Sequence, residues 1–493
     1  MTEKALDPGE ILSLIPETLS LDTLRGAGVL PLRREEDCLV LGVSSLEAYG
    51  NAQLLSKGFE GRARIEVTDP TLLNGLFDRL YSLRSRIASD DVEAIEGVAD
   101  LDAVAREDIQ SDSVSAPVIR LVNSLFFEAV KERATDIHVE PFEDRCEVRF
   151  RVDGVLHNKL LLPKTHQAPL TTRIKVMARM DISERFSPQD GRIGISVGGR
   201  SVDIRVGAVP TQHGERLALR LLDKKEGLLT LEQLGMPGKS RAALEEMVAK
   251  PYGMVLLTGP TGSGKTTSLY AILQKLARPE VNVITVEDPI EYDLPGVGQI
   301  QVNEKAGVTF ASALRAILRQ DPDIIMVGEM RDFDTAHMGV QASLTGHLVL
   351  STLHTNDAPS AVVRLADMGV EPYLVAGSLL GVVAQRLVRR VCPSCACEAE
   401  APPAFRKLGI ETVQRGTGCE RCMGTGYFGR TGLYELLVMD DALREAVSGG
   451  ASSSRIREEA RGKGFKSLWE LGLKRVRQGL TTPEELYRAV GEA

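Results

Sequence analysis

A glycine-rich segment, GPTGSGKT, constrains the fold of this 493-residue chain more than any other feature. It runs from Gly259 to Thr266 and fits the pattern G-x-x-x-x-G-K-[ST]. The apolar run MVLLT precedes it, and the helical pattern TTSLYAILQKL follows it. In a strand, loop and helix of this order, backbone N–H groups and the positive end of the helix surround phosphate oxygens. The segment therefore predicts a nucleotide site built into an α/β fold.

Single positions of this loop have predicted roles. Lys265 is expected to reach the β- and γ-phosphates, and the Thr266 hydroxyl is expected to bind Mg²⁺. The alternative, a glycine-rich turn that merely precedes a helix, is disfavoured by the flanking strand and helix. The residues expected to hold the nucleotide are Gly259, Pro260, Thr261, Gly262, Ser263, Gly264, Lys265, Thr266 and Thr267.

Strands alternate with helices from about residue 226 to residue 390. The expected strands, MVLLT, VNVITV, DIIMV and HLVLSTL, are near-continuous apolar runs, which is typical of a parallel sheet covered on both faces. Carboxylates follow two of them, at the sheet edge where ligands of open α/β sheets bind. Such acids organise Mg²⁺ and water in hydrolysis, although solvated loop acids remain the alternative. The two groups are Glu287, Asp288 and Glu291 in VITVEDPIEY, and Glu329, Arg331 and Asp332 in DIIMVGEMRD.

Two histidines flank a third strand in TGHLVLSTLHTND. His347 precedes the apolar run and His354 ends it. A bond to phosphate or to an acidic partner and an ordinary structural role both stay open for each.

Arginines form a further candidate set. Arg315 and Arg319 are four residues apart and so share a helix face. Alternation along two expected strands puts Arg149, Arg151 and Arg205 on one exposed sheet face, with Arg220 as a further member. Two interpretations stay open: ion pairs on a soluble surface, and arginine fingers that reach the nucleotide of a neighbouring subunit.

The rest of the chain separates by composition. Residues 1–85 resemble a small α/β module, with CLVLGVSS as a strand and a helix starting at Thr68, whose apolar stripe is Leu72, Leu73, Leu76, Phe77 and Leu80. Residues 86–115 carry nine acids and two arginines, which favours a mobile linker, a short amphipathic helix being the alternative. Residues 116–225 combine an apolar helical stripe with strands of period-2 alternation. The domains expected are therefore 1–85, 86–115, 116–225 and 226–493.

Charge, aromatic content and the length of apolar runs disfavour a nucleic-acid binder, a secreted protein and a membrane-spanning protein. Lys and Arg number 59 against 68 Asp and Glu, a net charge of −9, and aromatic residues make up 4%. Both values disfavour a nucleic-acid partner. The acidic start MTEKALDPGE is unlike a signal peptide, and the longest apolar run is far shorter than the ~20 residues that span a bilayer. We expect a cytosolic protein that reaches a membrane only through a partner.

Five of the seven cysteines gather near the C-terminus. CPSC is followed by 23 residues and then CERC, and two such hooks provide four thiolates in tetrahedral geometry. Four thiolates leave no open position, so a structural Zn²⁺ is expected at Cys392, Cys395, Cys419 and Cys422. Two alternatives stay open: Cys397 in place of Cys395, and a redox pair at one hook.

Together these motifs resemble the secretion-ATPase family, most closely the assembly ATPase of type II secretion systems and next the type IV pilus extension ATPase. The resemblance covers about residue 116 to the end. It rests on SAPVIRLVNSL, ATDIHVEP, RFRVDG, GAVPTQHGERLALRLLD, GPTGSGKTTSLY, TVEDPIEY, QVNEKAGVTFASALRAILRQDPDIIMVGEMRD, LTGHLVLSTLHTNDA, the paired C-x-x-C and GRTGLYELL. The first 85 residues match poorly.

The resemblance implies an α/β fold in which a PAS-like module and a RecA-like P-loop NTPase domain clamp ATP, with a small N-terminal docking domain and a zinc insert at about 391–432. It implies a homohexamer that hydrolyses ATP on the cytoplasmic side of the inner membrane and contacts membrane platform proteins. Glu287 is the expected base, with Glu329 as the alternative, and Glu329 is expected to organise Mg²⁺ and water. His347 and His354 match the family's His box. Arginines associated with ATP and the subunit interface are Arg149, Arg151, Arg205, Arg220, Arg315 and Arg319.

Overall fold

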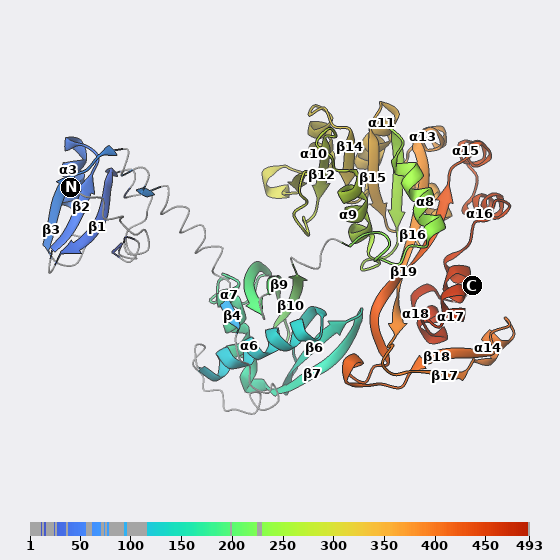
Figure 1. The fold of residues 1–493 in the computed structure, drawn as a ribbon, viewed down its shortest axis with the longest axis horizontal. Helices are drawn as coiled ribbons and strands as arrows, with labels where there is room; N and C mark the ends of the chain where they lie inside the picture. The colour runs from blue at the N-terminus through green and yellow to red at the C-terminus, as the bar shows by residue number, and fades with distance from the viewer. Residues whose placement is uncertain are drawn as a thin grey trace. The chain divides into compact units, whose positions relative to one another are not determined.

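The computed structural model describes residues 11, 14–15, 24, 27–35, 38–55, 62–70, 73, 76–77, 93–95, 116–197, 200–223 and 229–491. The chain divides into two compact units (Figure 1). One contains residues 1–96 and 194–198, and the other contains residues 97–193 and 199–493. The domain boundaries expected at residues 85, 115 and 225 fall outside the described residues.

The first unit contains a three-stranded sheet. β1 (Val29–Glu35) and β2 (Cys38–Val43) form an antiparallel hairpin, and β3 (Arg62–Val67) pairs in parallel with β2. α3 (Leu46–Leu55) makes the crossover between the two parallel strands, as parallel pairing requires. The strand expected in CLVLGVSS is confirmed as β2, whose last five residues are buried.

The stripe expected after Thr68 is helical where it is described. Leu73, Leu76 and Phe77 are helical and at most 3% exposed. Leu72 and Leu80 lie outside the described residues. Within the expected linker 86–115, the described segment is the strand β4 (Glu93–Ile95), which pairs in parallel with residues 195–197.

What we call the first module is residues 116–223, which belong to the second unit except for 194–198. α6 (Ala116–Lys131) buries the predicted stripe, including Leu121 and Leu125. β6 alternates between buried and half-buried positions along its whole length, so the predicted period-2 pattern is confirmed. In the sheet the order is β8-β9-β10-β5-β6-β7, with α7 (Gln167–Met177) connecting β7 to β8. The strands are β5 (Ala134–Pro141), β6 (Arg145–Val152), β7 (Val155–Pro163), β8 (Gln189–Val197), β9 (Arg200–Thr211) and β10 (Gly214–Asp223).

Residues 229–491, the P-loop module, contain a sheet of seven strands in the order β13-β12-β14-β15-β11-β16-β19. All of its pairings are parallel except that of β16 with β19. The four predicted apolar strands are confirmed as β11, β12, β14 and β15. The strands are β11 (Gly253–Thr258), β12 (Val283–Glu287), β13 (Gly298–Gln301), β14 (Ile324–Val327), β15 (Leu348–Leu353), β16 (Leu379–Val391) and β19 (Tyr427–Val438).

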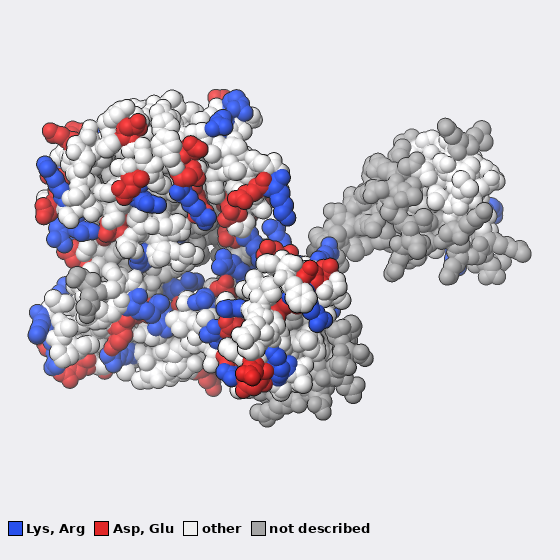
Figure 2. Space-filling view, turned by 180° about the vertical axis from the view of Figure 1, so that it is seen from behind, with Lys and Arg blue, Asp and Glu red and all other residues white. Residues whose placement is uncertain are grey.

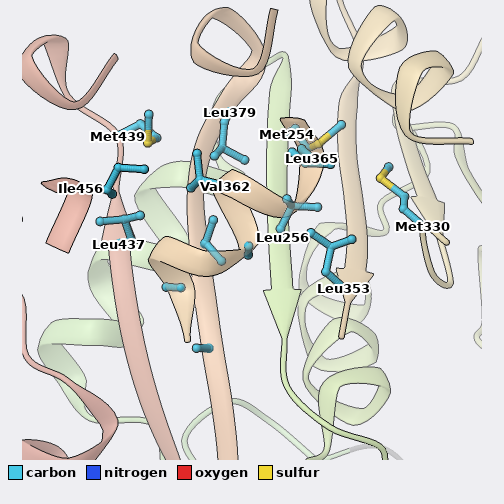
Figure 3. Close-up of a cluster of buried hydrophobic side chains, with 14 of the residues drawn as sticks. Met254, Leu256, Met330, Leu353, Val362, Leu365, Leu379, Leu437, Met439 and Ile456 are labelled. Carbon is cyan, nitrogen blue, oxygen red and sulfur yellow. The ribbon is translucent and has the colours of Figure 1, made fainter. Parts of the chain in front are cut away.

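Helices cover both faces of this sheet, which is why its strands are continuously apolar (Figure 1). Successive residues of β11 enter different cores: Met254 and Leu256 join one cluster, and Val255 and Leu257 join another. Figure 3 shows the first cluster, where Leu256 lies near Leu353 between the sheet and its helices. The helices are α8 (Gly238–Val248), α9 (Lys265–Leu276), α10 (Phe310–Ile317), α11 (Phe333–Leu344), α12 (Ala358–Asp367) and α13 (Pro372–Ser378).

The cysteine-rich insert lies between the two long strands β16 and β19. It contains the hairpin of β17 (Ala396–Glu400) and β18 (Thr412–Gly416), with α14 (Pro403–Arg406) between them. Beyond Ala384, β16 pairs with β19 and no longer with β11. The described residues after β19 form four helices: α15 (Asp441–Ser448), α16 (Ser453–Arg461), α17 (Leu468–Arg477) and α18 (Pro483–Val490).

Candidate nucleotide site

The glycine-rich segment forms a tight loop between β11 and α9. Gly259, Gly262 and Gly264 have φ angles of 151°, 76° and 87°, which L side chains rarely adopt. A Cβ on Gly259 would also lie 2.5 Å from the main-chain oxygen of Gln385. Glycine is therefore required for both conformation and space. The loop leads directly into the N-terminus of α9, the part of a helix that favours anions.

Lys265, the first residue of α9, points back over this loop. Its Nζ donates to the main-chain oxygens of Gly259 at 2.7 Å and Pro260 at 3.1 Å. The pKa of Lys265 is lowered to about 8, chiefly by burial; Glu329 acts in the opposite direction, and Arg386 acts in the same direction as burial. A partly desolvated ammonium at a helix N-terminus gains from an anionic ligand. Thr266, next along the chain, is exposed to the same cleft.

A cleft of about 880 Å³ joins the loop to the first module. The volume suits a small-molecule ligand of nucleotide size. Figure 2 shows basic side chains gathered along the hollow between the two modules of this unit. From the P-loop module the lining includes Lys265, Thr266, Glu287, Asp288, Glu291, Glu329, Arg331, His354, Arg386, Arg430 and Arg488. From the first module it includes Asp136, His138, Arg151, Asp153 and Arg220.

Glu287, the last residue of β12, is held rigidly. Its side chain accepts hydrogen bonds from the Tyr270 hydroxyl, from Thr285 Oγ1 at 2.6 Å and from Gln299 Nε2 at 3.0 Å. The residue is only 2% exposed. The pKa of Tyr270 is raised, mainly by burial and also by its hydrogen bond to Glu287. Each carboxylate oxygen therefore accepts at least one hydrogen bond, which fixes the side chain, and Oε2 keeps a lone pair beyond the bond from Tyr270.

Glu329 follows β14 and faces the cleft with freer oxygens. Arg331 Nη2 lies 2.6 Å from its Oε1, and His354 Nε2 lies 3.3 Å from its Oε2. Arg331 and His354 are exposed, so either can turn away when a ligand binds. Glu329 also acts electrostatically on Lys265. This carboxylate is the one placed to meet a ligand above the loop.

The two candidate histidines have different positions. His354 lines the cleft beside Glu329. His347 precedes β15, at the opposite end of that strand, and its Nδ1 lies 2.9 Å from the main-chain oxygen of Ala342. His347 is absent from the cleft lining, so the structure gives it a local contact with the helix before its strand.

The six arginines fall into four groups. Arg151 and Arg220 line the cleft and pair with Asp136 at 3.5 and 3.2 Å. Arg149 pairs with Glu140 away from the cleft. Arg315 and Arg319 are exposed at the end of α10 and after it, outside the cleft.

Arg205 forms the fourth group because it joins the two modules. Its Nη1 lies 2.9 Å from Glu291 Oε2, and its Nη2 donates to the main-chain oxygen of Ile290. Glu291 N in turn lies 3.2 Å from the Tyr270 hydroxyl, which also binds Glu287. The arginine therefore attaches the first module to the loop that follows β12.

Sequence reasoning missed other residues of the cleft. Asp153 accepts from Gly429 N at 2.8 Å, and Arg430 Nε lies 3.8 Å from it, so this aspartate also joins the modules. Beside it, the guanidinium of Arg133 lies 3.8 Å from the centre of the Phe428 ring. The quoted stretches RFRVDG and GRTGLYELL contain Asp153 and Arg430, but nothing in their spacing pairs them.

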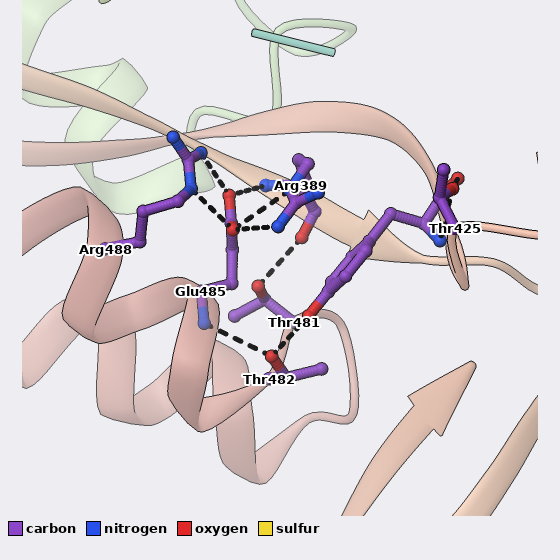
Figure 4. Close-up of polar contacts among 7 residues, drawn as sticks. Arg389, Thr425, Thr481, Thr482, Glu485 and Arg488 are labelled. Atoms are coloured by element: carbon purple, nitrogen blue, oxygen red, sulfur yellow. Dashed lines mark hydrogen bonds and ion pairs between the residues drawn. The ribbon is translucent and has the colours of Figure 1, made fainter. Parts of the chain in front are cut away.

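The C-terminal helix α18 also reaches the cleft, through Arg488. Figure 4 shows Glu485 between Arg389 of β16 and Arg488. Glu485 Oε1 accepts from Arg389 N at 2.9 Å, and its Oε2 accepts from Arg389 Nε at 3.0 Å and from Arg488 Nε at 2.8 Å. Burial opposes ionisation of Glu485, but the bonds from Arg488 and Arg389 hold its pKa below the ordinary value.

The four predicted cysteine ligands lie together, with all Sγ atoms within 4.8 Å of one another. Cys392 and Cys419 are 3.8 Å apart, Cys395 and Cys422 are 3.8 Å apart, and Cys419 and Cys422 are 3.7 Å apart. Four sulfurs at about 2.3 Å from a tetrahedral Zn²⁺ would be roughly 3.8 Å apart, so the group fits that metal. Cys397 is exposed and outside the group.

Backbone N–H groups favour the thiolate form of one cysteine in this cluster, Cys422. Burial opposes ionisation of Cys422, but the N–H groups of Cys419 and Gly426, at 3.2 and 3.3 Å from its Sγ, help to lower its pKa to about 6. Such N–H···S bonds stabilise the thiolate, the form that binds metal.

The phosphate loop and acidic strand ends on a parallel sheet define a P-loop NTPase. A family model described as "Type II/IV secretion system protein" matches residues 111–488. Type II secretion system protein E of Pseudomonas aeruginosa is 51% identical, over 97% of each chain, and type II secretion system ATPase E of Vibrio cholerae is 50% identical, over 78% of each. The chain belongs to this family and is a type II secretion ATPase of the E type.

A solved structure, the pilus retraction motor PilT with bound ADP, resembles the chain with a TM-score of 0.51 and 27% identity, over 74% of this chain and 95% of that one. Mixed α/β architecture is therefore confirmed. Among the described residues, no helix is long and apolar enough to cross a membrane.

Proposed function

We propose that this chain is the hexameric motor of a type II secretion system, and that it hydrolyses ATP between a PAS-like first module and a RecA-like P-loop module. The observation that carries the proposal is the shared cleft, in which Lys265 and Glu329 from one module face Asp136 and Arg220 of the other. Hydrolysis that changes the angle between the modules would move whatever the motor is attached to.

The proposed roles follow from position. The loop and Lys265 hold the phosphates, and Thr266 and Glu329 would hold Mg²⁺, which neutralises charge on the phosphates. Glu287 takes the proton of the attacking water, directly or by polarising it, from its fixed place at the end of β12. Arg205, by tying the modules together at Glu291, sets how far the cleft closes.

The exposed arginines suit a different role. Arg315 and Arg319 carry charge outside their own cleft, so in a ring they can reach the nucleotide of the next subunit. The hexamer is proposed to work on the cytoplasmic side of the inner membrane and to bind the cytoplasmic parts of platform proteins. Its first unit, with its own small sheet, is the proposed docking part. A structural Zn²⁺ at the four cysteines holds the insert.

Mg²⁺-dependent phosphate release by the purified, assembled chain tests the proposal. We expect Lys265→Ala to abolish release, and Lys250→Ala, at an exposed lysine of the same module, to leave it unchanged. Full activity of Lys265→Ala would refute the phosphate site. Phosphate release that stays absent with membrane partners present would favour an ATP-binding scaffold without turnover. Type IV pilus extension is the alternative within the class, and genomic neighbours distinguish it.

A further inference from the structure

An arginine outside the predicted motifs, Arg386, lies against the phosphate loop. It belongs to β16, 121 residues after Lys265 in the chain, and it lines the cleft. A Cβ on Gly259 would lie 3.2 Å from its Nη1. The main-chain oxygen of the same glycine accepts the 2.7 Å bond from Lys265. Two cationic side chains therefore meet at the first glycine of the loop.

The two terminal nitrogens of Arg386 have different surroundings. Nη2 donates to the main-chain oxygen of Asn356 at 3.3 Å and to its Oδ1 at 3.2 Å. Nη1 is buried and has no hydrogen-bond partner in the part of the chain that the structure describes. A buried donor left unpaired costs about 1–3 kcal/mol. One end of the guanidinium is thus fixed by protein, and the other is directed at the loop.

The electrostatics at this point favour an anion. Among the described residues, no carboxylate lies within ion-pair distance of Arg386. Burial lowers the pKa of Arg386, while Glu435 and Asp357 act in the opposite direction from farther away. Arg386 also lowers the pKa of Lys265. Two partly desolvated cations that repel each other are both stabilised by one anion between them.

We propose that Arg386 is a phosphate-binding residue of this ATPase, and that its Nη1 donates to an oxygen of the β- or γ-phosphate while Asn356 fixes the guanidinium through Nη2. The inference rests on the proposed function, because it takes the loop from Gly259 to Thr266 as the phosphate site. The planar guanidinium suits the task, since it binds the protein through one nitrogen and the phosphate through another.

The test is a titration of the full chain with fluorescent ATP, ADP and AMP. We expect Arg386→Gln to weaken binding of ATP and ADP about 10- to 100-fold, the effect of losing one charge-assisted hydrogen bond, and to change AMP binding less than about twofold. The matched control is Arg390→Gln, an exposed arginine of the same strand, which should change nothing. Arg386→Lys should recover part of the loss. Unchanged ATP affinity, or an equal loss for all three nucleotides, would overturn the inference.

Two further measurements separate the explanations. If Lys265→Ala abolishes ATP binding while Arg386→Gln leaves it unchanged, the role proposed for Arg386 is refuted and the phosphate site at the loop stands. If Lys265→Ala binds ATP as the unchanged protein does, the proposed function itself fails. Thermal unfolding without nucleotide should differ by less than about 2 °C between Arg386→Gln and the unchanged protein. A large drop in melting temperature together with an equal loss for AMP would assign Arg386 a purely structural role and refute the proposal.

Discussion

Replacement of Glu485 by glutamine should release the C-terminal helix α18 from β16. The side chain of Glu485 has an exposed fraction of 0%, and it receives hydrogen bonds from the guanidinium groups of Arg389 and Arg488 (Figure 4). Glutamine keeps the shape, but it removes the charge and points an amide N–H₂ at two cations. Arg389, with 16% of its side chain exposed, cannot easily reach water, whereas Arg488 at 44% can.

The expected cost follows from this difference in exposure. Breaking a buried ion pair from one side costs about 3–5 kcal/mol, and an exposed pair contributes about 1 kcal/mol or less. Because Arg488 can turn to solvent, we place the cost of Glu485→Gln at the lower end, about 3 kcal/mol. That corresponds to a roughly 100-fold increase in the local opening of α18. Arg488→Gln, the matched control, should increase opening less than about fivefold.

Hydrogen exchange of the amides in α18 measures this opening directly, and it avoids assigning one unfolding transition to a chain of several modules. The pH dependence gives a second check. The folded pKa of Glu485 is lowered, so its stabilising effect is complete above its ordinary value of 4.5 and is lost as the pH falls through the folded pKa. The variant should lack this acid-dependent component. Exchange in α18 that is the same in both proteins at neutral pH would refute the reasoning.

Further predictions concern other parts of the second unit. Cys419→Ser should reduce bound zinc from one per chain to well below one by elemental analysis, whereas Cys397→Ser should leave it at one. Glu329→Gln should lower kcat by at least about 100-fold with ATP affinity within about threefold, and equal kcat would exclude a role at the phosphates. Arg205→Ala should remove the ion pair with Glu291, and amide hydrogen exchange in the loop after β12 should then become faster. Unchanged exchange in that loop would show that Arg205 does not hold the two modules together there.

Short-range patterns in the sequence predicted the elements well. The glycine loop, the four apolar strands and the alternation along β6 each reflect a local rule of backbone conformation or one-sided burial. The cluster of four cysteines was also predictable, because each C-x-x-C segment places its own two thiols close together. Cys395 rather than Cys397 joins the group, a choice that depends on how β17 leaves the hook.

Long-range pairings could not be read from the chain. Arg386 meets Gly259 because β16 lies next to β11, and Asp153 meets Gly429 because the end of β6 lies near the start of β19. Neither neighbour relation leaves a local signal. The sequence also could not show which of His347 and His354 lines the cleft. They flank opposite ends of β15, and the end at His354 is the one that meets the cleft.

The length of β16 and β19 has a mechanical consequence. β16 has 13 residues and its parallel neighbour β11 has six, so at ~3.3 Å per residue β16 is about 40 Å long, roughly twice the length of β11. Past Ala384, β16 and β19 continue as a two-stranded ribbon that carries the cysteine insert and the contact at Asp153 (Figure 1). A two-stranded ribbon is more strongly twisted than a full sheet. The ribbon is anchored in the sheet at one end and contacts the first module at the other, so a change in its twist would move the first module relative to the sheet.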